Sequence, residues 1–144
     1  MKVKCIFNTG KALLDYERIP LGTTDITQYG QLEIGKEYLV MGMIMTDGYL
    51  TYLVDDDVIN ACPYQFFEIT DSQLTPNWYF KALTKQDKNY PNQEAVWGYY
   101  ELCFNDNHYA QLVDMEESAM RIYFKRKIET EKIFADNALM QGIV

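Results

Sequence analysis

Apolar and polar side chains alternate at the start of the chain. Residues 2–7 place Val3, Cys5 and Phe7 on one side, a period of two that is typical of a half-buried strand. Further along, an almost continuous apolar run ends at Asp47-Gly48, a dipeptide typical of a two-residue hairpin turn, which predicts a strand on either side of it. Related patterns occur around Phe66 and after residue 95. We therefore expect strands at residues 2–7, 37–46, 49–55, 65–70 and 96–104.

A helical period replaces this alternation near the C-terminus. Asp114 followed by Glu117 matches a capping box, and the apolar positions from Met115 onwards recur every three or four residues. This pattern predicts a long helix over residues 115–137. A second apolar face lies off the main stripe and consists of Met120, Phe124 and Ile128. We expect that face to pack against the protein itself, the alternative being contact with a second chain.

No repeat, low-complexity tract or linker divides the sequence, so we expect one domain over residues 1–144. Strands followed by a long helix predict the α+β class. The longest apolar stretches are broken by Gly42, Asp47 and Gly48, well short of the roughly 20 apolar residues that a membrane span needs. Residues 1–7 do not form the apolar region of a signal peptide. We expect a cytoplasmic protein with no membrane contact.

Charge is distributed unevenly along the chain. The formal net charge is -8, while residues 44–120 alone carry a net -10, from three lysines and thirteen carboxylates. Such a segment repels a phosphate backbone, so we expect no nucleic acid ligand unless the basic run 125–127 binds one. A basic protein would be attracted to it. The competing explanation is solubility, since any large net charge keeps a small domain dispersed.

Few residues point to catalysis. Residues 30–36 have the glycine and lysine spacing of a phosphate-binding loop, but a strand is expected next instead of a helix, which argues against a nucleotide. His108 is the only histidine and lies in a polar, turn-like stretch, so we expect it to be exposed to solvent. Cys5, Cys62 and Cys103 show no metal or redox spacing and are expected to be buried thiols. We predict no catalytic residue, no metal and no cofactor.

The acidic segment also contains eight of the twelve tyrosines. Tyrosine combines a large rigid face with a polar tip and is enriched at protein interfaces, although we expect more than half of these rings to fill the core. Asp55-Asp56-Asp57 is the one carboxylate cluster, and it is expected to face a cationic partner or solvent. The predicted partner-binding residues are Asp55, Asp56, Asp57, Glu68, Asp71, Asp106, Tyr49, Tyr64 and Tyr109.

The segments 32–42, 52–56 and 66–71, together with Trp78, resemble the SH3-like barrel cores of small uncharacterised bacterial proteins. The expected architecture is therefore a curved antiparallel sheet or a small SH3-like β-barrel with the C-terminal helix packed on it. The resemblance to such small acidic proteins implies an immunity protein that neutralises a basic toxin, possibly a nuclease, by covering its active site. Two alternatives stay open: a metal-dependent enzyme using Asp55–Asp57 near His108, and a subunit of a larger assembly.

Overall fold

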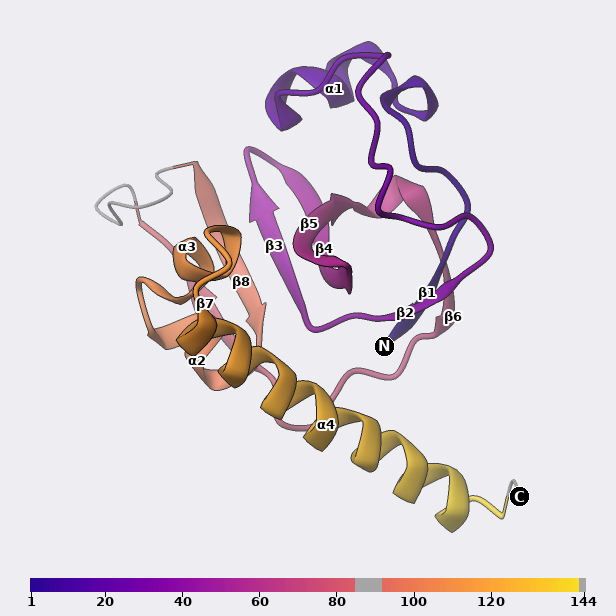
Figure 1. Ribbon diagram of the computed structural model, residues 1–144, viewed down its shortest axis with the longest axis vertical. Coiled ribbons are helices and arrows are strands. Elements are labelled where there is room, and N and C mark those ends of the chain that lie inside the picture. Colours follow the sequence, from indigo (N-terminus) through magenta and orange to yellow (C-terminus); the bar gives the residue numbers. More distant parts are fainter. Residues whose placement is uncertain (85–91, 143–144) are drawn as a thin grey trace.

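Two antiparallel sheets form the framework of the protein in the computed structural model, which describes residues 1–84 and 92–142 (Figure 1). The three-stranded sheet has the order β2-β1-β6, with bounds Glu37–Leu39, Lys2–Cys5 and Phe67–Asp71. The five-stranded sheet has the order β5-β4-β3-β8-β7, with bounds Val58–Pro63, Tyr49–Asp56, Gly42–Thr46, Gln93–Gly98 and Tyr79–Ala82. The predicted α+β class is confirmed. The described strands form a pair of curved sheets and no closed barrel.

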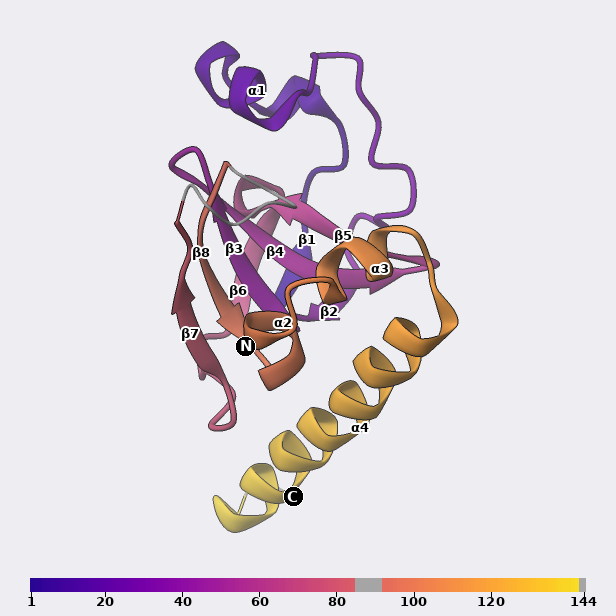
Figure 2. The same ribbon diagram turned by 90° about the vertical axis from the view of Figure 1, so that its left-hand side faces the viewer.

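The helices lie around these sheets at different ends. Helix α1 lies at the opposite end of the molecule from the long α4, while α2 and α3 lie beside the five-stranded sheet (Figures 1 and 2). Their bounds are Asp15–Leu21 for α1, Tyr100–Phe104 for α2, His108–Val113 for α3 and Glu117–Met140 for α4. Two short 3-10 turns cover Gly10–Ala12 and Tyr64–Phe66.

The central hairpin is confirmed. Strands β3 and β4 pair in an antiparallel register around Asp47 and Gly48, whose φ values of 49° and 80° are those of a turn that continues the strand twist. The strand predicted over 37–46 is divided at Val40, because β2 belongs to one sheet and β3 to the other. Both halves are apolar since each faces a buried layer. The hydrophobic pattern of residues 37–46 therefore does not show where β2 ends and β3 begins.

The strand predicted over 96–104 is wrong in its second half. Strand β8 ends at Gly98 and α2 follows directly, with Leu102 and Cys103 buried and Tyr100 exposed. Two successive buried residues fit a helical turn and not a strand. Gly98 permits this turn because the Leu102 side chain packs where a Cβ would lie. Strands β5 and β7 and helix α1 are additional elements that the sequence patterns did not predict.

The C-terminal helix is confirmed over most of its predicted length. Helix α4 begins at Glu117, and the capping box at Asp114 is wrong because the N-cap is Glu116, with no side-chain hydrogen bond to the cap. Asp114 instead ends α3. The second apolar face of α4 is not internal, since Phe124 and Ile128 are 39% and 68% exposed. Its outer side is therefore open to solvent.

Buried side chains form two clusters, one centred on Phe66 beneath the three-stranded sheet and one centred on Tyr123 beneath α4. The three cysteines are buried and free, as predicted. In the part of the chain that the structure describes, no helix combines the length and apolar character that a membrane crossing requires.

Candidate binding surfaces

The structure distributes the nine predicted partner-binding residues over separate regions. Tyr49 begins β4 and Asp55 lies six residues later near the end of the same strand, which separates them by about 20 Å. Glu68 and Asp71 lie on β6, in the other sheet. Asp56 and Asp57 directly follow Asp55 at the end of β4. The other three lie in the 3-10 turn after β5, in the α2–α3 connection and on α3, and are Tyr64, Asp106 and Tyr109. These residues form no single patch.

Asp55 is bound within the protein. Its two carboxylate oxygens accept hydrogen bonds from Lys127 Nζ at 2.9 and 2.8 Å, and one of them also accepts a hydrogen bond from the Tyr123 hydroxyl at 2.8 Å. Tyr123 is completely buried, and burial followed by the nearby Asp55 charge raises its pKa well above the ordinary value. The hydroxyl is therefore a fixed donor, and Asp55 joins α4 to β4.

Asp56 makes a similar link on the other side of β4. It accepts hydrogen bonds from the Tyr38 hydroxyl at 2.8 Å and from Lys36 Nζ at 3.3 Å, which joins β4 to β2. Asp57 follows in the β4–β5 turn with φ 63° and an exposed side chain. Of the three consecutive carboxylates, Asp57 is the one directed to solvent without a lysine partner among the described residues.

Other predicted residues also have internal roles. The Tyr49 hydroxyl donates to the backbone carbonyl of Tyr16, and Asp106 pairs with Lys81 at 3.3 Å. Tyr109 is partly buried against the cluster around Tyr123. Tyr64 is 44% exposed and Glu68 is exposed, and they remain available for contact.

His108 is fully buried, so the expectation of an exposed turn histidine is wrong. Its Nε2 lies 2.6 Å from the Tyr99 hydroxyl. Burial raises the pKa of Tyr99, which keeps that hydroxyl protonated. The enzyme alternative uses the Asp55–Asp57 cluster near His108, and two of those carboxylates, Asp55 and Asp56, pair with Lys127 and Lys36. Within residues 1–84 and 92–142, no group of three or more His, Cys, Asp or Glu side chains is arranged to hold a metal ion.

The buried imidazole predicts a pH dependence of stability. Burial lowers the pKa of His108 below its ordinary value of 6.5, and the nearby Glu101 charge offsets this shift only in part. The unfolded chain therefore binds a proton before the folded protein does, and stability decreases as pH falls from about 6.5 towards the lowered folded pKa, by at most about 1.4 kcal/mol per pH unit. Urea unfolding from pH 7.5 to 5.5 measures this slope.

His108→Gln is the matched control, because glutamine retains a polar group beside Tyr99 and does not titrate. The slope should become flatter in this variant. Equal slopes in both proteins would contradict a depressed His108 pKa.

Glu101 titrates outside this pH window. Partial burial alone would raise the pKa of Glu101, but hydrogen bonds from Arg126 hold that pKa below its ordinary range. The contribution of Glu101 to stability is therefore lost only at more acidic pH.

An apolar groove lies along the outer face of α4. Met120 and Phe124 line it together with Met115 from the α3–α4 turn, and it extends onto Val58 and Ile59 of β5 at one end and along α4 to Ile128 at the other. Figure 2 shows the α3–α4 turn beside the end of the β4–β5 hairpin, which brings these segments together. We call these six residues the α4 groove.

Met115 occupies a backbone position that favours glycine. Its φ is 56°, in the left-handed region, and the N–H groups of Met115 and Glu116 donate to the carbonyls of Leu112 and Gln111. These two bonds form the Schellman ending of α3, where glycine is the usual residue. The methionine side chain is 52% exposed and lines the groove. The sequence thus has a flexible apolar side chain where glycine would be more stable.

Carboxylates surround the end of the α4 groove where α4 begins. Asp57 and Glu117 line the groove, and the exposed Asp114 and Glu116 flank Met115. Arg121 pairs with Glu117 at 2.5 Å, which leaves this end with an excess of negative charge. Lys125 and Glu129 lie at the other end. The rim therefore complements a positive group next to an apolar surface.

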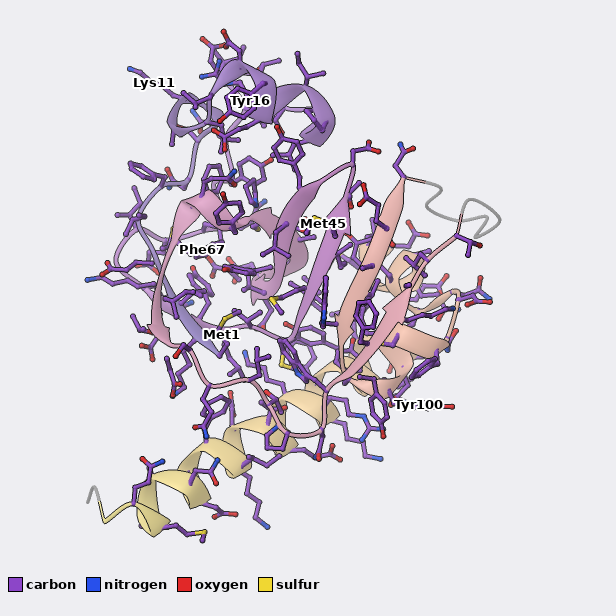
Figure 3. The ribbon with its side chains drawn as sticks, turned by 180° about the vertical axis from the view of Figure 1, so that it is seen from behind. Met1, Lys11, Tyr16, Met45, Phe67 and Tyr100 are labelled. Carbon is purple, nitrogen blue, oxygen red and sulfur yellow. The ribbon has the colours of Figure 1, made fainter. Side chains whose placement is uncertain are left out.

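A second exposed surface lies at the edge strand β7. Tyr79, Tyr100 and Phe104 contact one another with ring centroids 5.1–5.7 Å apart, although each is more than 40% exposed. On the opposite face of β7, Phe80 lies 5.0 Å from Trp97. Figure 3 shows Tyr100 at the periphery with its hydroxyl directed outwards. Of these residues, Tyr79 and Tyr100 lay in the tyrosine-rich segment, but nothing in the sequence indicated that β7 is an edge.

Comparison of the chain with models of protein families, with curated proteins and with solved structures found no match. A function for the chain is therefore inferred from its own surfaces, the α4 groove and the edge of β7.

Proposed function

We propose that this protein is a non-enzymatic binding protein and that the α4 groove holds a basic amphipathic helix of a partner protein. A helix of that kind inserts apolar side chains into a groove at intervals of three and four residues, and Met-lined grooves adapt to many such partners. The groove supplies the apolar surface, and the carboxylates at its rim attract the positive charges.

The position of Met115 carries this proposal. Folding alone favours glycine at a left-handed C-terminal position of a helix, by about 1 kcal/mol. An exposed methionine there offers little packing in return. Its side chain is of use if a partner covers it, because burying a methionine against another chain contributes about 1.5–3 kcal/mol.

A second copy of the chain is the competing occupant of the groove. Two copies with a net charge of -8 each repel one another, which disfavours this pairing. A toxin-neutralising immunity protein is the form of this proposal that the resemblance to small acidic bacterial proteins supports, with a basic toxin as the partner. A basic toxin would also be attracted by the acidic segment 44–120.

The test uses a synthetic 18-residue peptide of leucine and lysine with one apolar helical face, and a scrambled peptide of equal composition. In the wild-type protein we expect micromolar binding of the first peptide and much weaker binding of the second. Met115→Gly should weaken binding about tenfold, as expected for losing roughly 1.4 kcal/mol of contact, while raising the unfolding midpoint by about 3 °C. Affinity and stability thus change in opposite directions.

Met140→Ala is the matched control, since Met140 is 86% exposed near the end of α4 and outside the groove. It should leave binding unchanged. Equal binding of the two peptides, or unchanged affinity in Met115→Gly, would contradict the proposal. Concentration-dependent dimerisation that disappears in Phe124→Ala would assign the groove to a second copy instead.

A further inference from the structure

The outer edge of β7 carries backbone N–H and C=O groups that pair with no strand in the described part of the chain. In an antiparallel pair, residues alternate between those bonded to the neighbouring strand and those directed away from it. The Leu83 N–H donates to the Glu94 carbonyl at 2.8 Å, and Ala82 lies opposite Ala95 in the same register. Ala82 and, two residues earlier, Phe80 therefore direct their N–H and C=O groups away from β8. No other described strand pairs with this edge.

Proteins normally protect such an edge with charge, proline or a covering segment. The strand Tyr79–Ala82 contains one charged residue, Lys81, and that side chain pairs with Asp106. Aromatic rings flank the edge on both faces: Tyr79, Tyr100 and Phe104 lie on the α2 side, with Phe80 and Trp97 on the other. Among residues 1–84 and 92–142, the edge is thus unpaired and bordered by apolar surface.

We propose that β7 accepts an extended segment of a partner protein as an additional strand of the five-stranded sheet. Main-chain bonds to Phe80 and Ala82 hold the added segment. Its side chains alternate between the two faces, so one set contacts the Tyr79–Tyr100–Phe104 cluster and the next contacts Phe80 and Trp97. This surface is separate from the α4 groove and does not depend on the function proposed for it.

The exposed area favours a short segment over a second copy of the chain. Tyr79, Phe80, Tyr100 and Phe104 are each 43–54% exposed. Aromatic side chains of this size present together about 400 Å² at such exposures. A stable protein dimer needs about 800 Å² from each partner, roughly twice that area. An extended segment needs less apolar area because it also gains backbone hydrogen bonds.

The experiment uses an eight-residue blocked peptide of alternating valine and threonine with a lysine at each end. Amide hydrogen exchange, followed by NMR, reports on the outward N–H groups of Phe80 and Ala82. We expect the peptide to slow exchange of these two amides at least tenfold at saturation. The same peptide with N-methyl groups on the residues of both edges has no edge left that can pair and should bind more weakly, without requiring any change to the protein.

Ala82→Pro removes one outward N–H while leaving the bonds to β8 in place, because proline is tolerated on an edge strand when its nitrogen faces solvent. It should reduce peptide affinity at least fivefold, and Ala82→Thr, which retains the N–H, should not. No protection at millimolar peptide would overturn the proposal. It would also be overturned by equal affinity for the two peptides, or by concentration-dependent protection without peptide, which would assign the edge to a second copy.

Discussion

Replacement of Asp55 by alanine is expected to lower the free energy of unfolding by about 3 kcal/mol, because it leaves two largely buried donors without an acceptor. The side chains of Asp55 and Lys127 are only 18% and 24% exposed, so solvent replaces their contacts poorly. The Tyr123 hydroxyl also loses its acceptor in a fully buried position. Chemical denaturation monitored by circular dichroism measures the change.

The control for this prediction is Asp57→Asn, which alters a neighbouring carboxylate directed to solvent and keeps a residue type that tolerates a positive φ. Its stability should remain within about 0.5 kcal/mol of wild type. If Asp55→Ala were as stable as Asp57→Asn, the contacts with Lys127 and Tyr123 would not stabilise the fold. Replacing all three carboxylates would also remove the internal pairs of Asp55 and Asp56. The electrostatic attraction of a basic partner is therefore better tested by replacing Asp57 alone.

Replacement of Gly42 by alanine is expected to cost about 2 kcal/mol through overpacking. A Cβ at this position would lie 2.4 Å from Leu102 Cδ2 and 3.0 Å from the Trp97 carbonyl oxygen. The leucine side chain can move, but the carbonyl belongs to the neighbouring strand β8 and cannot shift without disturbing its pairing with β3.

Gly30→Ala provides the comparison, because a Cβ there meets no atom within 4 Å. That variant should be neutral or slightly more stable, since alanine reduces the freedom of the unfolded chain. Thermal unfolding of the two variants alongside wild type distinguishes the close approach of α2 to the sheet from a general effect of replacing glycine. Similar midpoints for all three proteins would contradict the prediction.

The elements that the sequence predicted best have a regular local pattern. The Asp47-Gly48 hairpin and the long α4 are set by turn chemistry and by helical spacing, which act over a few residues. The errors arise where tertiary contacts decide. Residues 100–104 are apolar at every second position, which suits a strand, but Leu102 packs on Gly42 and Gly98 as part of a helix. A sequence pattern that spans only a few residues cannot predict that contact.

The candidate surfaces also combine features that local sequence predicts with features that tertiary contacts decide. The apolar face of Met120, Phe124 and Ile128 was visible in the sequence, but its exposure depends on which face of α4 meets the sheets. The position of Met115 depends on the left-handed ending of α3. A glycine in the sequence would have predicted that ending, but a methionine does not. Asp55 and Asp56 were identified as a charged cluster, yet their lysine and tyrosine partners come from segments about 20 and 70 residues away. Such long-range pairing cannot be read from one sequence.

The five-stranded sheet connects the two proposed surfaces and constrains how they can be used together. Its outer strands are β5, whose Val58 and Ile59 line the α4 groove, and β7, and the strands between them are paired side by side without interruption. The α4 groove and the β7 edge are therefore held at a set spacing. A bivalent partner would gain avidity only if its linker spans that spacing, and linker length would act as a criterion of selection.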